Sequence, residues 1–202
     1  MDKDNLRIMI PPIIHYCWFG EKPIPNEYKK NIDSWKKFFP KHEIREWNEN
    51  NYDVHCIPFS SEAYEAKKFA YVSDYARLKI LYEHGGIYFD TDVEVIKNMD
   101  DILANGPWMG IEKHTSTPTT DDMVNVGVGF AVGPHHPIIS EIMSFYESTH
   151  YIFPDGHMEQ IPIVPIVTKV LRKYGMHNKV SNPTNIKGIT TVSYTHLRAH
   201  ET

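Results

Sequence analysis

Cysteine and basic charge are both scarce in this sequence, and each shortage excludes a class of protein. The 202 residues include only two cysteines, Cys17 and Cys56. Two are too few for a disulfide scaffold, so both are expected to be free thiols in a reducing compartment. Lysine and arginine total 21 against 26 aspartates and glutamates, which gives a net charge of −5. This balance argues against a nucleic-acid binder and leaves open a phosphate-containing ligand held through a metal ion.

Long apolar runs are lacking as well. The first seven residues are polar and the short apolar run after them holds two prolines, so no signal peptide is expected. No uncharged stretch reaches the length of a membrane span. The content of hydrophobic residues, 41%, is typical of a globular protein that can bury its own core. We therefore expect a soluble, cytoplasmic protein of one domain.

The segment 192–202, VSYTHLRAHET, shows neither apolar periodicity nor a capping pattern. The string resembles the translated end of a common transposase sequencing adapter, and we expect it to be a non-native read-through tail. On this interpretation the native domain covers residues 1–191, and its gene continues beyond Thr191.

Predicted strands and helices alternate along the chain. Apolar or alternating runs predict strands at 13–19, 43–47, 87–90, 93–96, 108–112, 127–132 and 186–192. Helical periodicity appears at 26–37, 61–84, 137–146 and 163–174. This order is typical of an α/β fold with a mostly parallel central sheet flanked by helices. His15, inside the first strand, is expected to be a hydrogen-bonded strand residue rather than a metal ligand.

The most informative pattern is GGIYFDTD at 85–92. Two glycines end a helix, a strand follows, and Asp90 and Asp92 stand at its end. Residues two apart on a strand face the same way, so the two carboxylates can converge on one hard cation. Ligands of open α/β sheets bind beyond the carboxyl ends of the strands, which suits a metal–diphosphate site. Taken alone, a pair of this kind is usually a solvated turn.

Asp74 and Arg77 stand three residues apart on the preceding helix, so they share a face. That face differs from the stripe expected to pack inward, which is Tyr71, Tyr75, Leu78 and Tyr82. A surface Asp–Arg pair contributes little by itself. So close to the aspartate pair, however, it can grip neighbouring sugar hydroxyls, and the guanidinium can approach a phosphate.

Three segments together resemble glycosyltransferase family 32, the transferases with a DXD sugar-binding region that are often found in bacterial capsule and polysaccharide clusters, mannosyltransferases among them. The segments are IPPIIHYCWFG (10–20), SWKKFFPKHEIREWNENNYD (34–53) and AYEAKKFAYVSDYARLKILYEHGGIYFDTDVEV (63–95). The spacing also resembles the glucosylating domains of large clostridial toxins. The resemblance implies a GT-A fold, a UDP- or GDP-sugar donor, Mn²⁺ or Mg²⁺, and retention of anomeric configuration.

The resemblance also implies roles for individual residues. Asp74 and Arg77, with Ser73 beside them, would bind the donor sugar, and Tyr88 would line the donor pocket. Trp18 would lie against the nucleobase, with core packing as an equal alternative.

At the metal, Asp90 would contact the ribose and the metal shell, and Asp92 would ligate the cation directly. Asp74, Arg77 and Asp92 are thus the expected catalytic residues, and Asp74 as a nucleophile stays open. The segment 113–125 would form a wall or lid over the donor, and Asn125 loosely matches a position near the acceptor.

The implied acceptor is a glycan or lipid-linked saccharide in cell-surface polysaccharide synthesis, reached by a cytoplasmic enzyme at the inner face of the membrane. Two other classes stay open: a non-catalytic glycan-binding module, and a metal-dependent nucleotidyltransferase or hydrolase. One family feature is missing, a late His-His-x-x-x-Ser-Trp-like segment, because His135 and His136 are followed by Pro137. We expect that the truncation at Thr191 explains this.

Overall fold

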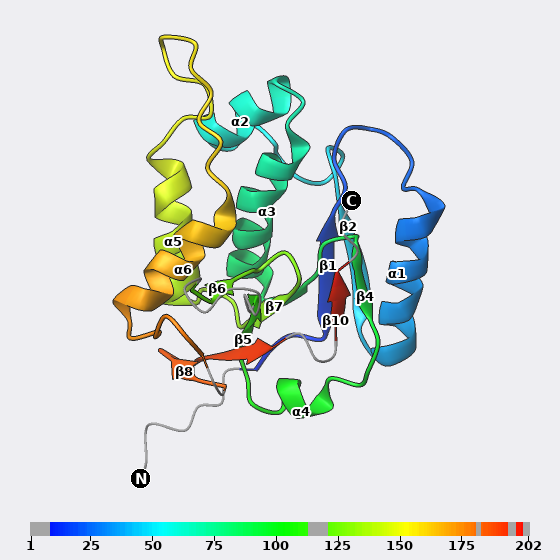
Figure 1. The fold of residues 1–202 in the computed structure, drawn as a ribbon. Coiled ribbons are helices and arrows are strands. Elements are labelled where there is room, and N and C mark those ends of the chain that lie inside the picture. The colour runs from blue at the N-terminus through cyan, green and yellow to red at the C-terminus, as the bar shows by residue number, and fades with distance from the viewer. Residues whose placement is uncertain (1–8, 113–120, 181–182, 194–196, 200–202) are drawn as a thin grey trace.

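The structure is a computed structural model that describes residues 9–112, 121–180, 183–193 and 197–199. These residues form an α/β fold in which helices cover a mixed sheet (Figure 1). The helices are α1 (Asn26–Phe38), α2 (Pro58–Glu65), α3 (Phe69–His84), α4 (Asp100–Leu103), α5 (Pro137–Glu147) and α6 (Ile163–Lys173). The strands are β1 (Ile13–Cys17), β2 (Glu43–Trp47), β3 (Gly86–Tyr88), β4 (Val93–Val95), β5 (Trp108–Glu112), β6 (Met123–Val124), β7 (Phe130–Val132), β8 (Asn185–Ile186), β9 (Ile189–Ser193) and β10 (Leu197–Ala199).

The main sheet has the order β2-β1-β3-β7-β5-β9-β8, and β6 pairs with β5. Parallel pairing joins β1 to β2, β1 to β3 and β5 to β9, whereas β7 runs antiparallel to both β3 and β5. The sheet is therefore mixed rather than mostly parallel, which corrects the sequence prediction. The described residues between β5 and β7 hold β6 and no helix, and the two strands pair antiparallel.

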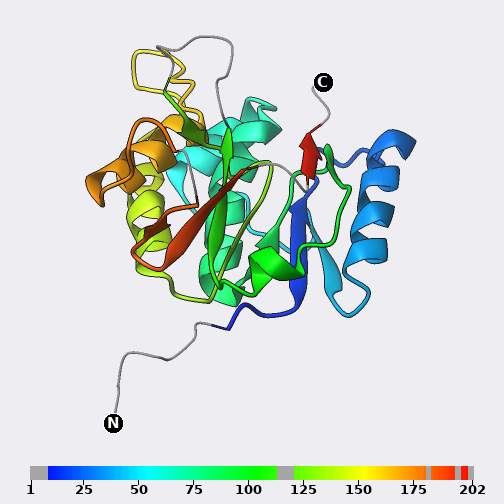
Figure 2. The ribbon, with the colours of Figure 1, turned by 60° about the horizontal axis from the view of Figure 1, so that its bottom comes forward.

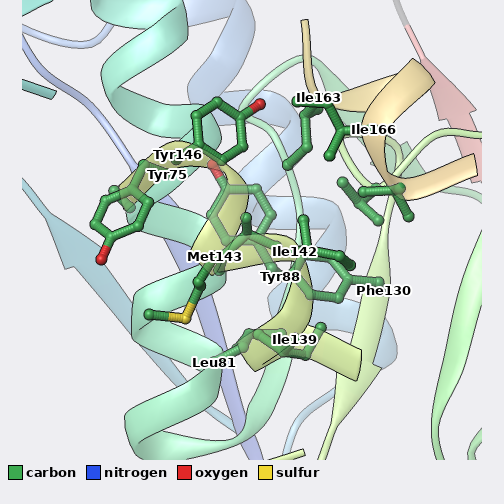
Figure 3. Packing of buried hydrophobic residues seen from close by; sticks show 14 of the residues in the cluster. Tyr75, Leu81, Tyr88, Phe130, Ile139, Ile142, Met143, Tyr146, Ile163 and Ile166 are labelled. Atoms are coloured by element: carbon green, nitrogen blue, oxygen red, sulfur yellow. The ribbon is translucent and has the colours of Figure 1, made fainter. Parts of the chain in front are cut away.

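Two apolar clusters fill the space on the two sides of the sheet. Helices α3, α5 and α6 lie on one side, and α1 lies on the other beside β4 and β10 (Figures 1 and 2). Figure 3 shows the larger cluster, in which α3, α5 and α6 pack on side chains of β3 and β7. The smaller cluster surrounds the fully buried Trp35 of α1. The carboxyl ends of β1 and β3 leave the sheet between these two layers.

The helix predicted over 61–84 is divided into α2 and α3. The break falls at residues 66–68, where Lys67 has a φ of 57° and the Lys68 amide donates to the Ala63 carbonyl at 2.8 Å. A positive φ at a lysine is a local backbone choice that apolar periodicity does not reveal. As a consequence, α3 begins at Phe69 and its first turns border the cavity described below.

His15 is a hydrogen-bonded strand residue, as predicted. Its side chain is fully buried, Nδ1 accepts from Trp47 Nε1 at 3.0 Å, and Nε2 lies 3.0 Å from the Gly85 carbonyl oxygen. Because Nδ1 accepts, Nε2 carries the proton and the ring is neutral. Burial lowers the pKa of His15 to about 4.

The predicted tail, 192–202, contributes to two strands in its described part. Strand β9 continues to Ser193, and β10 pairs antiparallel with β4, with Leu197 buried against the smaller cluster. The non-native origin of this segment stays a prediction. Over the described residues, no helix combines the length and the apolar character that crossing a membrane would require.

Candidate active site

A cavity of about 420 Å³ opens at the carboxyl ends of β1 and β3. Four segments line it: the end of β1 with the loop that follows it, the start of α1, the first half of α3, and the turn between β3 and β4. The lining residues are Cys17, Trp18, Phe19, Gly20, Lys22, Tyr28, Phe69, Ala70, Ser73, Arg77, Asp90, Thr91 and Asp92. The predicted Trp18, Ser73, Arg77, Asp90 and Asp92 thus come together in one place.

Asp90 and Asp92 lie in a turn, not on the strand that the sequence predicted. Strand β3 ends at Tyr88, and the Val93 amide donates to the Asp90 carbonyl at 3.0 Å, which closes the turn. The alternation of a strand therefore does not explain why both carboxylates line the cavity. The conformation of the turn directs both carboxylates toward the cavity, at the strand end where ligands of α/β sheets bind.

Arg77 joins the two acidic groups of the site. Its Nη2 lies 3.1 Å from Asp74 Oδ1 and its Nη1 lies 3.1 Å from Asp90 Oδ2. Nε donates to the Ser73 carbonyl at 3.0 Å, and the guanidinium stands 4.9 Å above the Tyr88 ring. Burial alone would lower the pKa of Arg77, but Asp90, Tyr88 and Asp74 outweigh it and raise the pKa well above its usual value.

The Asp74–Arg77 pair is buried, which corrects the reading of it as an exposed helix pair. The Arg77 side chain is only 5% exposed. The reason is that α3 is covered on more sides than its tyrosine stripe indicates, because α5 and the start of α6 close over it. Removing either partner of a buried pair of this kind costs far more stability than removing one partner of a surface pair.

Asp74 is fixed from two directions. Oδ1 pairs with Arg77, and Oδ2 accepts from the Ile163 amide, at the start of α6, at 3.3 Å. Burial raises the pKa of Asp74 to about 7, against the opposing effect of Arg77. The carboxylate stands behind Arg77 and is not among the residues that line the cavity. The contact with Ile163 joins positions 89 residues apart, so local sequence patterns do not predict it.

Tyr88 lies beneath the cavity rather than on its wall. Its side chain is almost completely buried in the larger cluster, as Figure 3 shows, and its hydroxyl donates to Asp90 Oδ1 at 3.0 Å. This corrects the prediction that Tyr88 lines the pocket. The inward face of a three-residue strand belongs to the core, so the ring reaches the site only through its hydroxyl and through the contact with Arg77.

Trp18 forms an aromatic wall of the cavity together with Tyr28. The ring centroids are 5.5 Å apart, and Trp18 Nε1 donates to the Lys22 carbonyl at 2.6 Å, which fixes the indole. Trp18 is only partly buried, although it packs on the smaller cluster. Sequence reasoning did not assign Tyr28 to the site. Its spacing of four from Ile32 on the inward face of α1 is the signal that could have found it.

A second loop closes the site from the side of Asp90. The Gly127 carbonyl accepts from the Asp90 amide at 3.0 Å, and the Gly127 amide donates to Asn125 Oδ1 at 3.0 Å. A Cβ at position 127 would collide with Asp90 Oδ2 and would lie 3.0 Å from Arg77 Nη1. Only the end of the predicted wall, 121–125, falls among the described residues, and 113–120 lie outside them.

The donor set suits a divalent cation shared with a diphosphate. Two carboxylates, Asp90 and Asp92, reach the cavity, and the described residues contain no group of three or more histidine, cysteine, aspartate or glutamate side chains arranged for a metal. Mg²⁺ is usually bound in this way, through one or two carboxylates with substrate phosphates and water completing the shell. Asp92 adds a third carboxylate to Asp74 and Asp90, which pair with Arg77, so the carboxylates outnumber the two cationic side chains at the site, Arg77 and Lys22, and favour a cation.

Comparison with known proteins places these features in a family. Residues 25–108 match the family model described as glycosyltransferase sugar-binding region containing DXD motif. An uncharacterized glycosyltransferase of Acanthamoeba polyphaga mimivirus is 30% identical, over 93% of this chain and 73% of the viral protein. Inositol phosphoceramide mannosyltransferase 1 of Schizosaccharomyces pombe is 27% identical over 73% of this chain, which spans 44% of the yeast protein.

The fold agrees with these matches. The solved structure of PaToxG glycosyltransferase superposes with a TM-score of 0.58 at 19% identity, covering 81% of this chain and 69% of that one. The architecture is that of the GT-A glycosyltransferases, with the DXD turn at the end of a central strand. The chain therefore belongs to the glycosyltransferases whose sugar-binding region contains the DXD motif.

Proposed function

We propose that this protein is a metal-dependent, retaining glycosyltransferase that moves a sugar from a UDP- or GDP-sugar to a hydroxyl of a glycan or lipid-linked saccharide. The observation that carries the proposal is the cavity itself. It places an aromatic wall, Trp18 with Tyr28, together with the guanidinium of Arg77 and the two carboxylates of the DXD turn. These groups match, in one space, the base, the sugar and the diphosphate of such a donor.

In this proposal each group has a separate task. Asp92, assisted by Asp90, would hold Mn²⁺ or Mg²⁺, and the bound cation would supply Lewis-acid stabilisation of the negative charge on the diphosphate leaving group. Trp18 stacks on the nucleobase, and Arg77 and Ser73 contact the donor. Asp90 keeps its place because Arg77 and Tyr88 each donate to one of its oxygens.

Asp74 positions the sugar site in this scheme and does not attack the sugar. Both of its oxygens are already engaged, by Arg77 and by the Ile163 amide, and the residue stands outside the cavity lining. The acceptor hydroxyl then attacks the front face of the donor sugar, which the resemblance to retaining enzymes supports. The anomeric configuration of the product, measured by NMR, tests this point, and an inverted product would refute it.

The sugar and the acceptor are proposed from the relatives. Two of them, from Schizosaccharomyces pombe, are named inositol phosphoceramide mannosyltransferases, which supports mannose as the first sugar to test and a lipid as an acceptor. We place the enzyme in the cytoplasm at the inner face of the membrane, in cell-surface polysaccharide synthesis. The outer face of α1 supports contact with anionic lipid because four exposed lysines gather there, Lys29, Lys30, Lys36 and Lys37.

The decisive experiment compares Asp92→Ala with the wild type on a panel of UDP- and GDP-sugars in Mn²⁺. We expect the wild type to release nucleoside diphosphate from one donor and the variant to lose that turnover. Asp33→Ala is the matched control, because Asp33 is an exposed aspartate of α1 that pairs with Lys36 at the surface. Equal donor turnover by Asp92→Ala and the wild type would refute the metal assignment. Binding of a glycan without metal and without donor cleavage would favour a glycan-binding module.

A further inference from the structure

Helix α1 holds the backbone of the segment 91–95 with three of its side chains. Asn31 Nδ2 donates to the Thr91 carbonyl at 2.9 Å, and Trp35 Nε1 donates to the Val93 carbonyl at 2.8 Å. Ser34 Oγ accepts from the Val95 amide at 2.9 Å. Strand β4 is not part of the main sheet, and its strand pairing among the described residues is with β10 alone. Side chains of α1 therefore satisfy backbone groups that a neighbouring strand would otherwise bind.

Asn31 is the member of this set that reaches the DXD turn itself. Thr91 stands between Asp90 and Asp92, so the carbonyl that accepts from Asn31 belongs to the peptide joining the middle residue to Asp92. Asn31 is 6% exposed and lies on the inward face of α1 with Ile32 and Trp35. A buried amide costs free energy unless its hydrogen bonds are made, so apolar packing does not explain an asparagine here.

The turn is held from the opposite side by main-chain bonds. The Asp90 amide donates to the Gly127 carbonyl at 3.0 Å, and the Val93 amide closes the turn on the Asp90 carbonyl at 3.0 Å. These bonds fix the first aspartate, whose carboxylate is also held by Arg77 and Tyr88. On the side of Asp92, the bond from Asn31 to Thr91 ties the intervening peptide to α1.

We propose that Asn31 is a positioning residue that sets the direction of the Asp92 carboxylate and thereby the affinity of the site for a divalent cation. The proposal rests on the proposed metal-dependent function. Groups that orient metal ligands through hydrogen bonds commonly change metal affinity by 10–100-fold when they are removed. Asn31 touches neither the cation nor the donor in this proposal and acts only through the Thr91–Asp92 peptide.

Ser34 provides a control on the same helix. Like Asn31 it makes one hydrogen bond to the backbone of the segment 91–95, but it meets Val95, beyond the turn. Ser34→Ala and Asn31→Ala each remove one hydrogen bond to this segment, and Ser34→Ala also removes the bond that Oγ donates to the Asn31 carbonyl at 2.6 Å, so each is expected to lower the melting temperature to a similar extent. Only Asn31→Ala is expected to alter the metal site.

The experiment measures Mn²⁺ binding to the whole protein by isothermal titration calorimetry with UDP and with GDP, together with the melting temperature of each variant. We expect Asn31→Ala to raise the Mn²⁺ dissociation constant about 10–100-fold. Ser34→Ala is expected to leave the constant within about twofold while lowering the melting temperature to a similar extent. If Asn31→Ala does not fold, Asn31→Gln keeps the amide, displaces it from Thr91, and is expected to weaken Mn²⁺ binding as well.

The outcomes separate the two proposals. If the folded Asn31 variant binds Mn²⁺ as tightly as the wild type, the role of Asn31 alone is overturned. The same holds if Ser34→Ala weakens Mn²⁺ binding as much as the Asn31 variant does. Absence of Mn²⁺ binding by the wild type with either nucleotide overturns the metal-dependent function, and the role of Asn31 falls with it. Mn²⁺ binding that is weakened in the Asn31 variant and not in Ser34→Ala supports both the metal-dependent function and the role of Asn31.

Discussion

Replacing Arg77 by methionine is the change that most directly tests the electrostatics of the site. Methionine keeps much of the volume of the stem but leaves Asp74 and Asp90 without the guanidinium that stands 3.1 Å from each. The side chain also makes a bond to the Ser73 carbonyl and a cation–π contact with Tyr88. The Arg77 and Asp74 side chains are only 5% and 12% exposed, so water replaces little of their lost interaction, whereas Asp90 is 33% exposed and is partly solvated.

The expected magnitude follows from this burial. Removing one partner of a buried ion pair costs about 3–5 kcal/mol because the other charge stays buried without compensation. For a protein of this length, that loss lowers the melting temperature by about 6–20 °C, at 2–4 °C per kcal/mol. Differential scanning calorimetry at pH 8 measures this loss, at a pH above the pKa of about 7 to which burial raises Asp74 beside Arg77.

Two further variants make the reasoning refutable. Arg45→Met removes an arginine that pairs with Glu43 at the surface, and its cost is expected to stay below about 1 kcal/mol. Adding Asp74→Asn to Arg77→Met is expected to restore part of the melting temperature, because it removes the uncompensated charge. A loss for Arg77→Met no larger than that of Arg45→Met would show that the buried triad contributes no more than a surface pair.

Three other predictions concern separate features. Burial lowers the pKa of His15 from 6.5 in the unfolded chain to about 4 in the folded protein. As the pH falls, the imidazole is therefore protonated in the unfolded chain before it is protonated in the folded protein. About 3 kcal/mol of the free energy of unfolding, present above pH 6.5, is lost toward pH 4. In His15→Gln this pH-dependent loss between pH 7 and 4 should be missing. Urea unfolding that gives the variant and the wild type the same pH profile of unfolding free energy would contradict the prediction. Gly127→Ala places a methyl group against Asp90 Oδ2, so Mn²⁺ binding should weaken strongly, and unaltered binding in calorimetry would show that the loop yields without cost. Glu62 accepts from the amides of Tyr151 and Ile152 at 2.7 and 2.9 Å, so Glu62→Ala should speed hydrogen exchange at these two amides, and full protection in the variant would refute the role of the carboxylate.

The sequence predicted the content of the cavity better than its architecture. Trp18, Ser73, Arg77, Asp90 and Asp92 were assigned from motifs and resemblance, and they do line one cavity. The expected geometry of the aspartates was wrong, because residues near a strand end were assumed to continue its alternation. Whether a strand ends at residue 88 or 90 depends on which neighbouring backbone groups pair with it, and those lie elsewhere in the chain.

Long-range contacts explain what else could not be predicted. The pairing of β3 with β7 and the bond from Ile163 to Asp74 join segments that local patterns cannot relate. The burial of Arg77 depends on the covering of α3 by α5 and by the start of α6, whereas the spacing on the helix gave only the shared face. Tyr88 shows the reverse case, because a residue of a motif was assigned to the pocket although its ring belongs to the core.

The bond between the Ile163 amide and Asp74 has a consequence for how the two halves of the molecule work together. The segment that leads from α5 into α6 is tethered at one end by Glu62 and at the other end by the carboxylate that orders Arg77. We therefore expect a change in the charge or direction of Asp74 to alter its bond to the first residue of α6, and a displacement of that residue to alter the pairing of Asp74 with Arg77. The Asp74 carboxylate thus connects the site directly to the helical layer beside it.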